Sequence, residues 1–244
     1  STGMAFEAGA SGKNLTEWQF GMASLNPRWN VSGTYMQVLP SFISTDQDGN
    51  DEKEFLLDYF NELPDLLSMV FLKGYQWPFD VNKIFGGSSV IDLLVYQETV
   101  LKKRRVFLDY RVNPGNLEKD RDLPYASMIP EAKEYLSQAG ACFGTPIERL
   151  KHMNEPAILF YQDHHVDLFK ERLEIAVCAQ HNNGGLSTNH LWETNLSGLY
   201  AIGEVCASHG VTRPGGTALN AGQVGAVRAA EGIFLKNELK VSRL

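Results

Sequence analysis

The polar residues best suited to chemistry lie close together near the end of the chain. Glu204 follows a short apolar run, residues 199–202, which predicts a buried strand, and α/β sheets place ligand-binding groups at strand ends. His209 and Arg213 lie in the loop that follows, and a Pro-Gly-Gly turn then leads into a predicted helix over residues 217–236. Backbone N–H groups at such a helix start bind negative charge. We therefore expect a ligand site in this stretch.

The predicted helix has a face of small residues, with Thr217 as its expected N-cap. The small residues are Ala218, Ala221, Gly222, Gly225, Ala226, Ala229 and Ala230. An ordinary amphipathic helix would carry larger apolar residues there. Small residues serve tight packing of the helix on its own sheet, and they also let a separate chain segment approach the backbone. The second alternative predicts an exposed apolar or small-residue surface that tends to self-associate.

Three stretches in this region resemble motifs of a known family. They are residues 181–185 (His-Asn-Asn-Gly-Gly), 198–205 (Gly-Leu-Tyr-Ala-Ile-Gly-Glu-Val) and 209–219 (His-Gly-Val-Thr-Arg-Pro-Gly-Gly-Thr-Ala-Leu). In order and spacing they resemble the C-terminal FAD-domain motifs of the succinate dehydrogenase/fumarate reductase flavoproteins, a family that includes L-aspartate oxidase. Residues 1–10 resemble the first helix after that family's dinucleotide-binding region.

The resemblance implies roles for individual residues. Arg213 corresponds to an arginine that clamps a substrate carboxylate, His181 to the histidine that joins it, and His209 to a residue that orients the loop or contacts substrate. The implied cofactor-binding residues are Gly203, Glu204, Gly215, Gly216, Thr217, Ala218 and Leu219. No metal is implied. The alternatives are a turn-capping role for Glu204, a loop role for His181 and a surface ion pair for Arg213.

The implied fold is α+β (α/β), with a mixed capping domain over residues 30–178 inserted into an FAD-binding domain formed by residues 1–29 and 179–244. The implied activity is that of an FAD-dependent oxidoreductase, which moves a hydride between flavin and a small carboxylate-bearing substrate. The alternative is a non-catalytic capping domain that binds a partner chain and has no cofactor of its own.

One motif of such proteins is missing. A dinucleotide-binding domain uses Gly-x-Gly-x-x-Gly to approach the cofactor pyrophosphate, and no two glycines of this chain are two positions apart. The chain also opens at Ser1 without a methionine. We therefore expect a fragment whose partner is the N-terminal FAD-binding half of a longer parent. On this hypothesis the parent holds FAD, whereas the isolated chain lacks it and is inactive.

Composition excludes several other classes. The 244 residues carry a net charge of −7, and the basic run at residues 102–105 is typical of a solvated helix end, so we expect no nucleic-acid partner. No apolar run is long enough to span a bilayer. Three separated cysteines, with no Cys-x-x-Cys, favour reduced thiols and a cytoplasmic location.

The middle of the chain predicts a mixture of elements. Strands are expected over residues 16–23, 34–45 (broken by Pro40) and 106–108, and helices over 52–72 (kinked or ended by Pro64), 88–103, 130–140 and 145–153. Phe79 occupies the place where the resembled fumarate reductases have a proton-donating arginine, and Arg111 is a substitute from elsewhere. His164 and His165 are adjacent, and neighbouring strand residues point to opposite faces, which argues against a shared metal ion.

Overall fold

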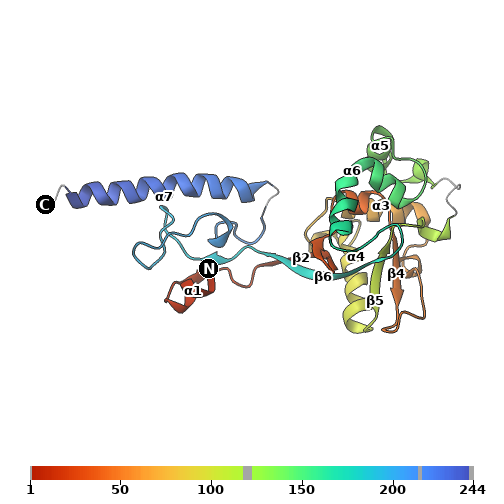
Figure 1. The fold of residues 1–244 in the computed structure, drawn as a ribbon, viewed down its shortest axis with the longest axis horizontal. Helices are drawn as coiled ribbons and strands as arrows, with labels where there is room; N and C mark the ends of the chain where they lie inside the picture. Colours follow the sequence, from red (N-terminus) through yellow and green to blue (C-terminus); the bar gives the residue numbers. More distant parts are fainter. Residues whose placement is uncertain (1, 118–122, 214–215, 242–244) are drawn as a thin grey trace. The chain divides into compact units, whose positions relative to one another are not determined.

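The computed structural model describes residues 2–117, 123–213 and 216–241 (Figure 1). The chain forms two compact units. We call Ser1–Gln19 with Ala179–Leu244 the first unit and Phe20–Cys178 the second unit. Each has its own cluster of buried apolar side chains, and the combination of helices with a sheet confirms the predicted α+β class.

The unit boundaries differ from the predicted domain division at one end. The sequence predicts a first segment of residues 1–29, whereas the first unit keeps only residues 1–19. The reason is a hairpin: strand β2 (Trp18–Leu25) pairs antiparallel with β3 (Arg28–Asn30), which holds residues 20–29 in the second unit. The assignment of the two units to a capping domain and an FAD-binding domain stays a prediction.

The sheet of the second unit has five strands in the order β3-β2-β6-β5-β4. The remaining strands are β4 (Ser41–Thr45), β5 (Arg105–Asp109) and β6 (Leu173–Asn182). β5 pairs antiparallel with both β4 and β6. The last residues of β6 extend into the first unit, so this strand carries the chain from the sheet directly towards His181.

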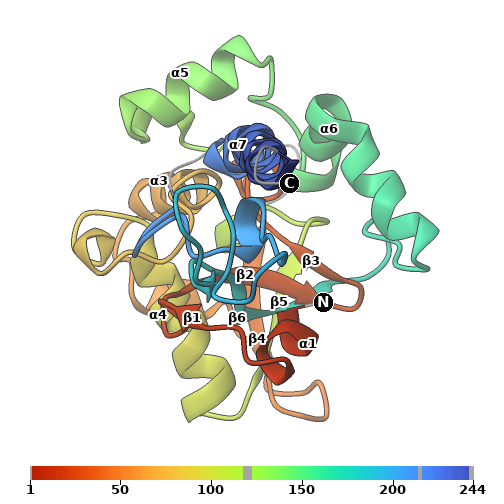
Figure 2. The ribbon, with the colours of Figure 1, turned by 90° about the vertical axis from the view of Figure 1, so that its left-hand side faces the viewer.

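Helices cover this sheet, and their starts follow from local sequence. α3 (Leu63–Lys73), α5 (Pro130–Gln138) and α6 (Pro146–Asp163) each have a proline in the first turn, where its missing N–H costs nothing. α6 also has the predicted capping box between Thr145 and Glu148. Figures 1 and 2 show α3, α5 and α6 together above the strands of their unit. The two other helices are α2 (Thr34–Gln37) and α4 (Ser89–Tyr96).

Three predictions for this unit were wrong in detail. Residues 34–45 form the short helix α2 followed by strand β4, and not strands throughout. The helix was missed because residues 35–37 are all buried and show no helical periodicity. In place of the helix expected over residues 52–72, the structure has a 3-10 turn, Phe55–Asp58, followed by α3. Pro64 lies in the first turn of α3 and does not kink the helix. The helix over 88–103 is α4 continued by a π-helical turn, Gln97–Leu101.

Asp109, at the end of β5, is a buried anchor of the second unit and is only 1% exposed. Its carboxylate accepts hydrogen bonds from Arg111 and Arg172 at 2.7 to 2.9 Å. Burial by itself raises the pKa of Asp109, but these two arginines outweigh burial and hold the pKa below 3.8. The Asp109 carboxylate therefore stabilises the folded state at every pH above its pKa in the unfolded chain. This contribution is lost as the pH falls through the lower pKa that Asp109 has in the folded state.

We expect Asp109→Asn to reduce the free energy of unfolding by about 3 kcal/mol at pH 7, because it leaves two arginines without their shared partner. Urea unfolding followed by circular dichroism measures this, at pH 7 and again at pH 3. The variant should also lose less stability than the wild type between these two pH values. Asp58→Asn is the control, because Asp58 is 75% exposed and 3.9 Å from Lys53. Equal unfolding midpoints for Asp109→Asn and wild type would contradict the assignment.

The first unit is built from short elements and one long helix. α1 (Thr2–Glu7) precedes β1 (Gly12–Lys13), which pairs antiparallel with β7 (Gly185–Leu186). The 3-10 turn η6 (Gly203–Val205) and helix α7 (Thr217–Val241) complete the unit. Residues 199–202 do not form the predicted strand, because only Tyr200 is paired, in a single bridge with Glu193. α7 begins at Thr217, so this residue is the first of the helix and not its expected N-cap.

Helix α7 packs on its own unit through its small residues. A Cβ placed on Gly225 would lie 3.0 Å from the side chains of Ile202 and Trp192, and one on Gly232 would lie 3.1 Å from Leu191. These glycines therefore serve tight internal packing, the first of the two alternatives. The exposed side of α7 instead carries large apolar side chains, Leu219, Val224, Val227, Ile233, Phe234 and Leu235. Among the described residues, no helix has the length and apolar character needed to cross a membrane.

Candidate functional site

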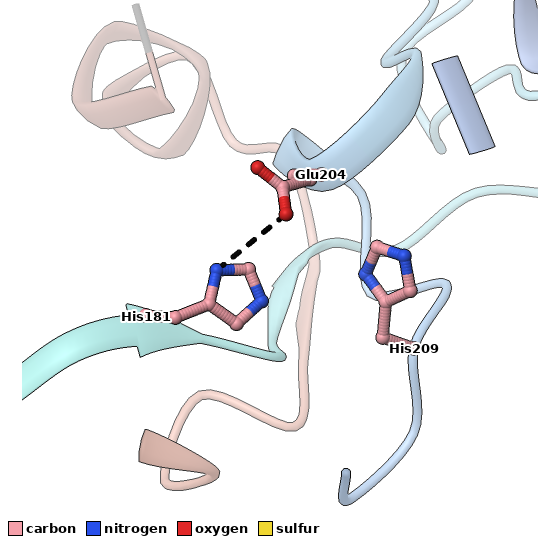
Figure 3. A group of neighbouring side chains, drawn as sticks. All are labelled: His181, Glu204 and His209. Carbon is pink, nitrogen blue, oxygen red and sulfur yellow. Dashed lines mark ion pairs between the residues drawn. The ribbon is translucent and has the colours of Figure 1, made fainter. Parts of the chain in front are cut away.

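Four polar side chains of the first unit converge from three segments. His181 lies at the end of β6, Glu204 lies in η6 and His209 lies in the loop before α7 (Figure 3). Arg213 lies in the same loop. His181 Nδ1 is 3.6 Å from Glu204 Oε1, and Arg213 Nε is 3.4 Å from the same oxygen. The His181 and His209 rings are 6.1 Å apart, centroid to centroid. The structure thus brings together the three predicted catalytic residues and Glu204.

The Asn-Asn-Gly-Gly turn after His181 holds this arrangement in place. The Asn183 side chain is 1% exposed and donates to the carbonyl of Val211 at 2.5 Å. A Cβ on Gly184 would lie 2.0 Å from the Asn14 carbonyl oxygen, and one on Gly185 would lie 2.2 Å from the Val205 carbonyl oxygen. Only glycine fits at either position. Asn183 thereby ties the loop of His209 and Arg213 to the strand of His181.

Sequence reasoning gave Asn183 no role. Its motif was recognised, but a buried asparagine in a polar Asn-Asn-Gly-Gly run has the composition of an ordinary exposed turn. The distinguishing contact, with Val211, joins residues 28 positions apart. No local pattern predicts such a contact.

The site is electrostatically prepared for a ligand. Burial lowers the pKa of His181 below 6.5, and Arg213 and His209 add to this effect, while Glu204 acts in the opposite direction. His181 Nε2, both ring nitrogens of His209 and Arg213 Nε are buried without a hydrogen-bond partner. Buried polar atoms are nearly always hydrogen-bonded in native proteins. A neutral imidazole carries one N–H, so Arg213 Nε and one ring nitrogen of His209 are donors that lack an acceptor, and a carboxylate supplies acceptor oxygens for both.

The expected cofactor-binding residues lie in η6 and at the start of α7. Gly203 is buried with φ of +77°, and Cys206 donates to its carbonyl through both its backbone N–H and its thiol. Gly216 also has φ of +77° and Thr217 begins α7, followed by Ala218 and Leu219. Gly215 lies outside the described residues.

The exposed side chains at this end of α7 fit a cofactor with a large apolar ring system. Leu219, in the first turn of α7, is 80% exposed, and Val211, in the loop that carries His209 and Arg213, is 70% exposed. A flavin ring offers apolar faces and a polar edge, so both kinds of surface have a partner on it. The residues present therefore fit part of an FAD site, while the pyrophosphate-binding glycines are not among them.

Other candidate residues have structural roles in the second unit. Arg111 binds Asp109 through two nitrogens and donates to the carbonyl of Lys170, so it is engaged in the fold and is not a free proton donor. His164 follows the end of α6, and His165 has φ of +63°, so these histidines lie in a turn and not on a strand as assumed. In the part of the chain that the structure describes, they belong to no group of possible metal ligands.

The comparisons with known proteins agree with these motifs. The model of a family described as an FAD binding domain matches residues 112–219. Two solved structures cover 94% of this chain, which spans 35% of their own chains. One is FrdA of E. coli quinol fumarate reductase, at 20% identity and a TM-score of 0.45. The other is a quinol-fumarate reductase with menaquinol molecules, at 21% identity and a TM-score of 0.47.

Two curated relatives match by sequence. One subunit of the fumarate reductase (CoM/CoB) of Methanothermobacter marburgensis is 37% identical over 99 residues, which is 40% of this chain and 18% of the relative. An uncharacterized FAD-dependent oxidoreductase of Methanocaldococcus jannaschii is 45% identical over 60 residues, 24% of this chain and 11% of the relative. These matches thus span less than a fifth of either relative. These matches agree with the resemblance of the motifs to the succinate dehydrogenase/fumarate reductase flavoproteins.

Proposed function

We propose that this chain is part of an FAD-dependent oxidoreductase that transfers a hydride between flavin and a small carboxylate-bearing substrate. The observation that carries the proposal is the convergence of His181, His209 and Arg213 on one place, with four buried nitrogens that have no hydrogen-bond partner. A related protein is named a fumarate reductase subunit, which supports a small dicarboxylate as the substrate class.

In this proposal Arg213 holds the substrate carboxylate. Its guanidinium is planar and permanently charged, and it matches a carboxylate with two parallel hydrogen bonds. The His181 imidazole is neutral at pH 7 and has one N–H to donate. It therefore orients the substrate carboxylate through a hydrogen bond, without adding a second full positive charge beside Arg213. The His209 ring lies 6.1 Å from the His181 ring, and it donates a hydrogen bond to the substrate from the ring nitrogen that carries the proton.

Glu204 and the start of α7 face the cofactor in the same proposal. A Glu204 oxygen accepts hydrogen bonds from cofactor hydroxyls, and the first N–H groups of α7 stabilise negative charge on the flavin ring. FAD, when bound, supplies the two-electron chemistry by exchanging a hydride with the substrate. The residues of this chain orient the substrate and keep water away from it.

The proposed partner of this chain is the half of an FAD-binding domain that holds the cofactor pyrophosphate. The large apolar side chains on the exposed side of α7 support this, since exposed apolar surface marks interaction sites. Self-association of the isolated chain through the same surface also stays a prediction. Light scattering over a concentration series tests it, and a strictly monomeric species would count against it.

The first experiment is to purify the longer parent protein and measure its flavin content and its turnover of small carboxylates, fumarate included. Stoichiometric FAD together with turnover supports the proposal. A colourless, inactive parent would favour the alternative, in which this chain only binds a partner.

The isolated chain is expected to bind FAD weakly, because most cofactor anchoring comes from pyrophosphate contacts with a glycine-rich turn that these residues do not contain. Addition of FAD should leave the melting temperature of the chain nearly unchanged, and the purified chain should be colourless. The measurement is thermal unfolding with and without excess FAD, and the longer parent serves as the positive control. Tightly bound stoichiometric flavin in the isolated chain would refute this prediction.

A further inference from the structure

We propose that His181, His209 and Glu204 form a binding site for a divalent transition-metal ion such as Zn²⁺. Each residue offers one ligand atom, and these three atoms all lie within 4.8 Å of one another (Figure 3). They come from β6, from η6 and from the loop after η6, so the fold itself assembles the set. In the described ranges this is the sole group of three such side chains.

The ligand chemistry fits zinc. Two imidazole nitrogens and one carboxylate oxygen form a known ligand set of catalytic zinc sites, in which the fourth position stays open. Ligand atoms at 2.0–2.1 Å from a tetrahedral ion are about 3.3 Å from each other. His181 Nδ1 and Glu204 Oε1 are already 3.6 Å apart, so only small side-chain rotations are required for this pair.

Both histidines are available as ligands. His181 Nε2 and the two ring nitrogens of His209 are buried and have no hydrogen-bond partner, so a metal ion bound through them displaces no hydrogen bond. His181 Nδ1, the ring nitrogen nearest Glu204, would exchange its contact with this carboxylate for the metal ion. An imidazole nitrogen without a proton offers a lone pair that suits zinc, copper and nickel ions. A bound ion therefore satisfies atoms that the fold otherwise leaves unpaired.

Arg213 is the group that opposes a cation here. Its Nε lies 3.4 Å from Glu204 Oε1, so a metal ion must draw this oxygen away from the guanidinium. Arg213 Nε makes no hydrogen bond, which indicates a contact weaker than a hydrogen-bonded ion pair. Arg213→Ala should consequently tighten metal binding, although the same change removes the proposed carboxylate clamp.

The metal site has a consequence that rests on the proposed function. His181 serves the metal ion in one state and the substrate carboxylate in the other, so the two ligands exclude each other. Glu204 likewise exchanges its proposed contact with a cofactor hydroxyl for the metal ion. Zn²⁺ is expected to inhibit the parent enzyme competitively with its carboxylate substrate.

The test is calorimetric titration of the 244-residue chain with Zn²⁺, supported by the visible absorption spectrum of Co²⁺, which reports coordination directly. We expect one Zn²⁺ per chain, at least about tenfold weaker binding for His181→Ala and His209→Ala, and tighter binding for Arg213→Ala. His190→Ala is the matched control, because His190 is an exposed histidine of the same unit. Thermal unfolding of each variant verifies that it is folded.

Two results would overturn the metal site: no Zn²⁺ binding by the folded chain, or binding that neither His181→Ala nor His209→Ala weakens. The titration uses neither flavin nor substrate. A parent that fails to turn over carboxylates therefore leaves the metal result intact, and a chain that fails to bind Zn²⁺ leaves the oxidoreductase proposal intact.

Discussion

Arg213→Lys in the proposed parent oxidoreductase is expected to lower kcat/KM for a carboxylate substrate by about a hundredfold. Lysine keeps the positive charge but loses the planar fork, so the substrate carboxylate is held by one point contact and the reacting carbon is misplaced. A misplacement of about 1 Å costs on the order of a hundredfold in rate. The flavin content should stay normal, because we propose that Arg213 binds the substrate and not the cofactor.

The measurement combines steady-state kinetics with flavin occupancy on the same preparation. Arg228→Lys is the matched control, since Arg228 is an exposed arginine of the first unit and should tolerate the change. An unchanged kcat/KM for Arg213→Lys would remove Arg213 from the substrate site and favour a substrate of another class.

Arg149→Met is expected to destabilise the second unit by about 4 kcal/mol or more, a large share of a typical domain stability. Arg149 is fully buried, and burial lowers its pKa to about 10, so it is still charged at neutral pH. Its guanidinium donates to the carbonyls of Val38, Phe143 and Gly144 and to Asn113 Oδ1, at 2.7 to 3.1 Å.

These acceptors explain why the effect should be large. Replacing a buried ion pair by apolar residues is often harmless, because both partners are removed together. Here three partners of Arg149 are backbone carbonyls that no side-chain substitution removes. Each buried carbonyl left without a donor costs about 1–3 kcal/mol.

Urea unfolding of Arg149→Met, followed by circular dichroism, measures the loss. Arg105→Lys is the control, because the Arg105 side chain is 36% exposed and bridges Glu174 at the surface. A loss below about 1 kcal/mol for Arg149→Met would show that the buried network is dispensable.

The starts of helices were predicted correctly where residues within a single helical turn determine them. The prolines and the Thr145–Glu148 capping box gave the starts of α5 and α6, because these residues act within one helical turn. Residues 34–37 were misassigned because a four-residue helix buried on nearly all sides has no hydrophobic period. The kink at Asn154, two residues before Pro156, was missed, since the expected helix ended at residue 153.

The site shows the same division between local and long-range information. His181, Glu204, His209 and Arg213 were singled out because their motifs resemble a family, and the structure places them together. The buried contacts of Arg149 and the contact of Asn183 with Val211 depend on segments far apart in the chain. The packing of Gly225 against Trp192 likewise depends on tertiary structure and not on the helix sequence alone.

The most direct test of the oxidoreductase proposal is rapid mixing of the parent protein, with its flavin chemically reduced, against small unsaturated carboxylates such as fumarate in the absence of oxygen. We predict reoxidation of the flavin that saturates with carboxylate concentration and that is slowed by Arg213→Lys. Flavin that stays reduced with every carboxylate, although an artificial electron acceptor reoxidises it, would contradict the account.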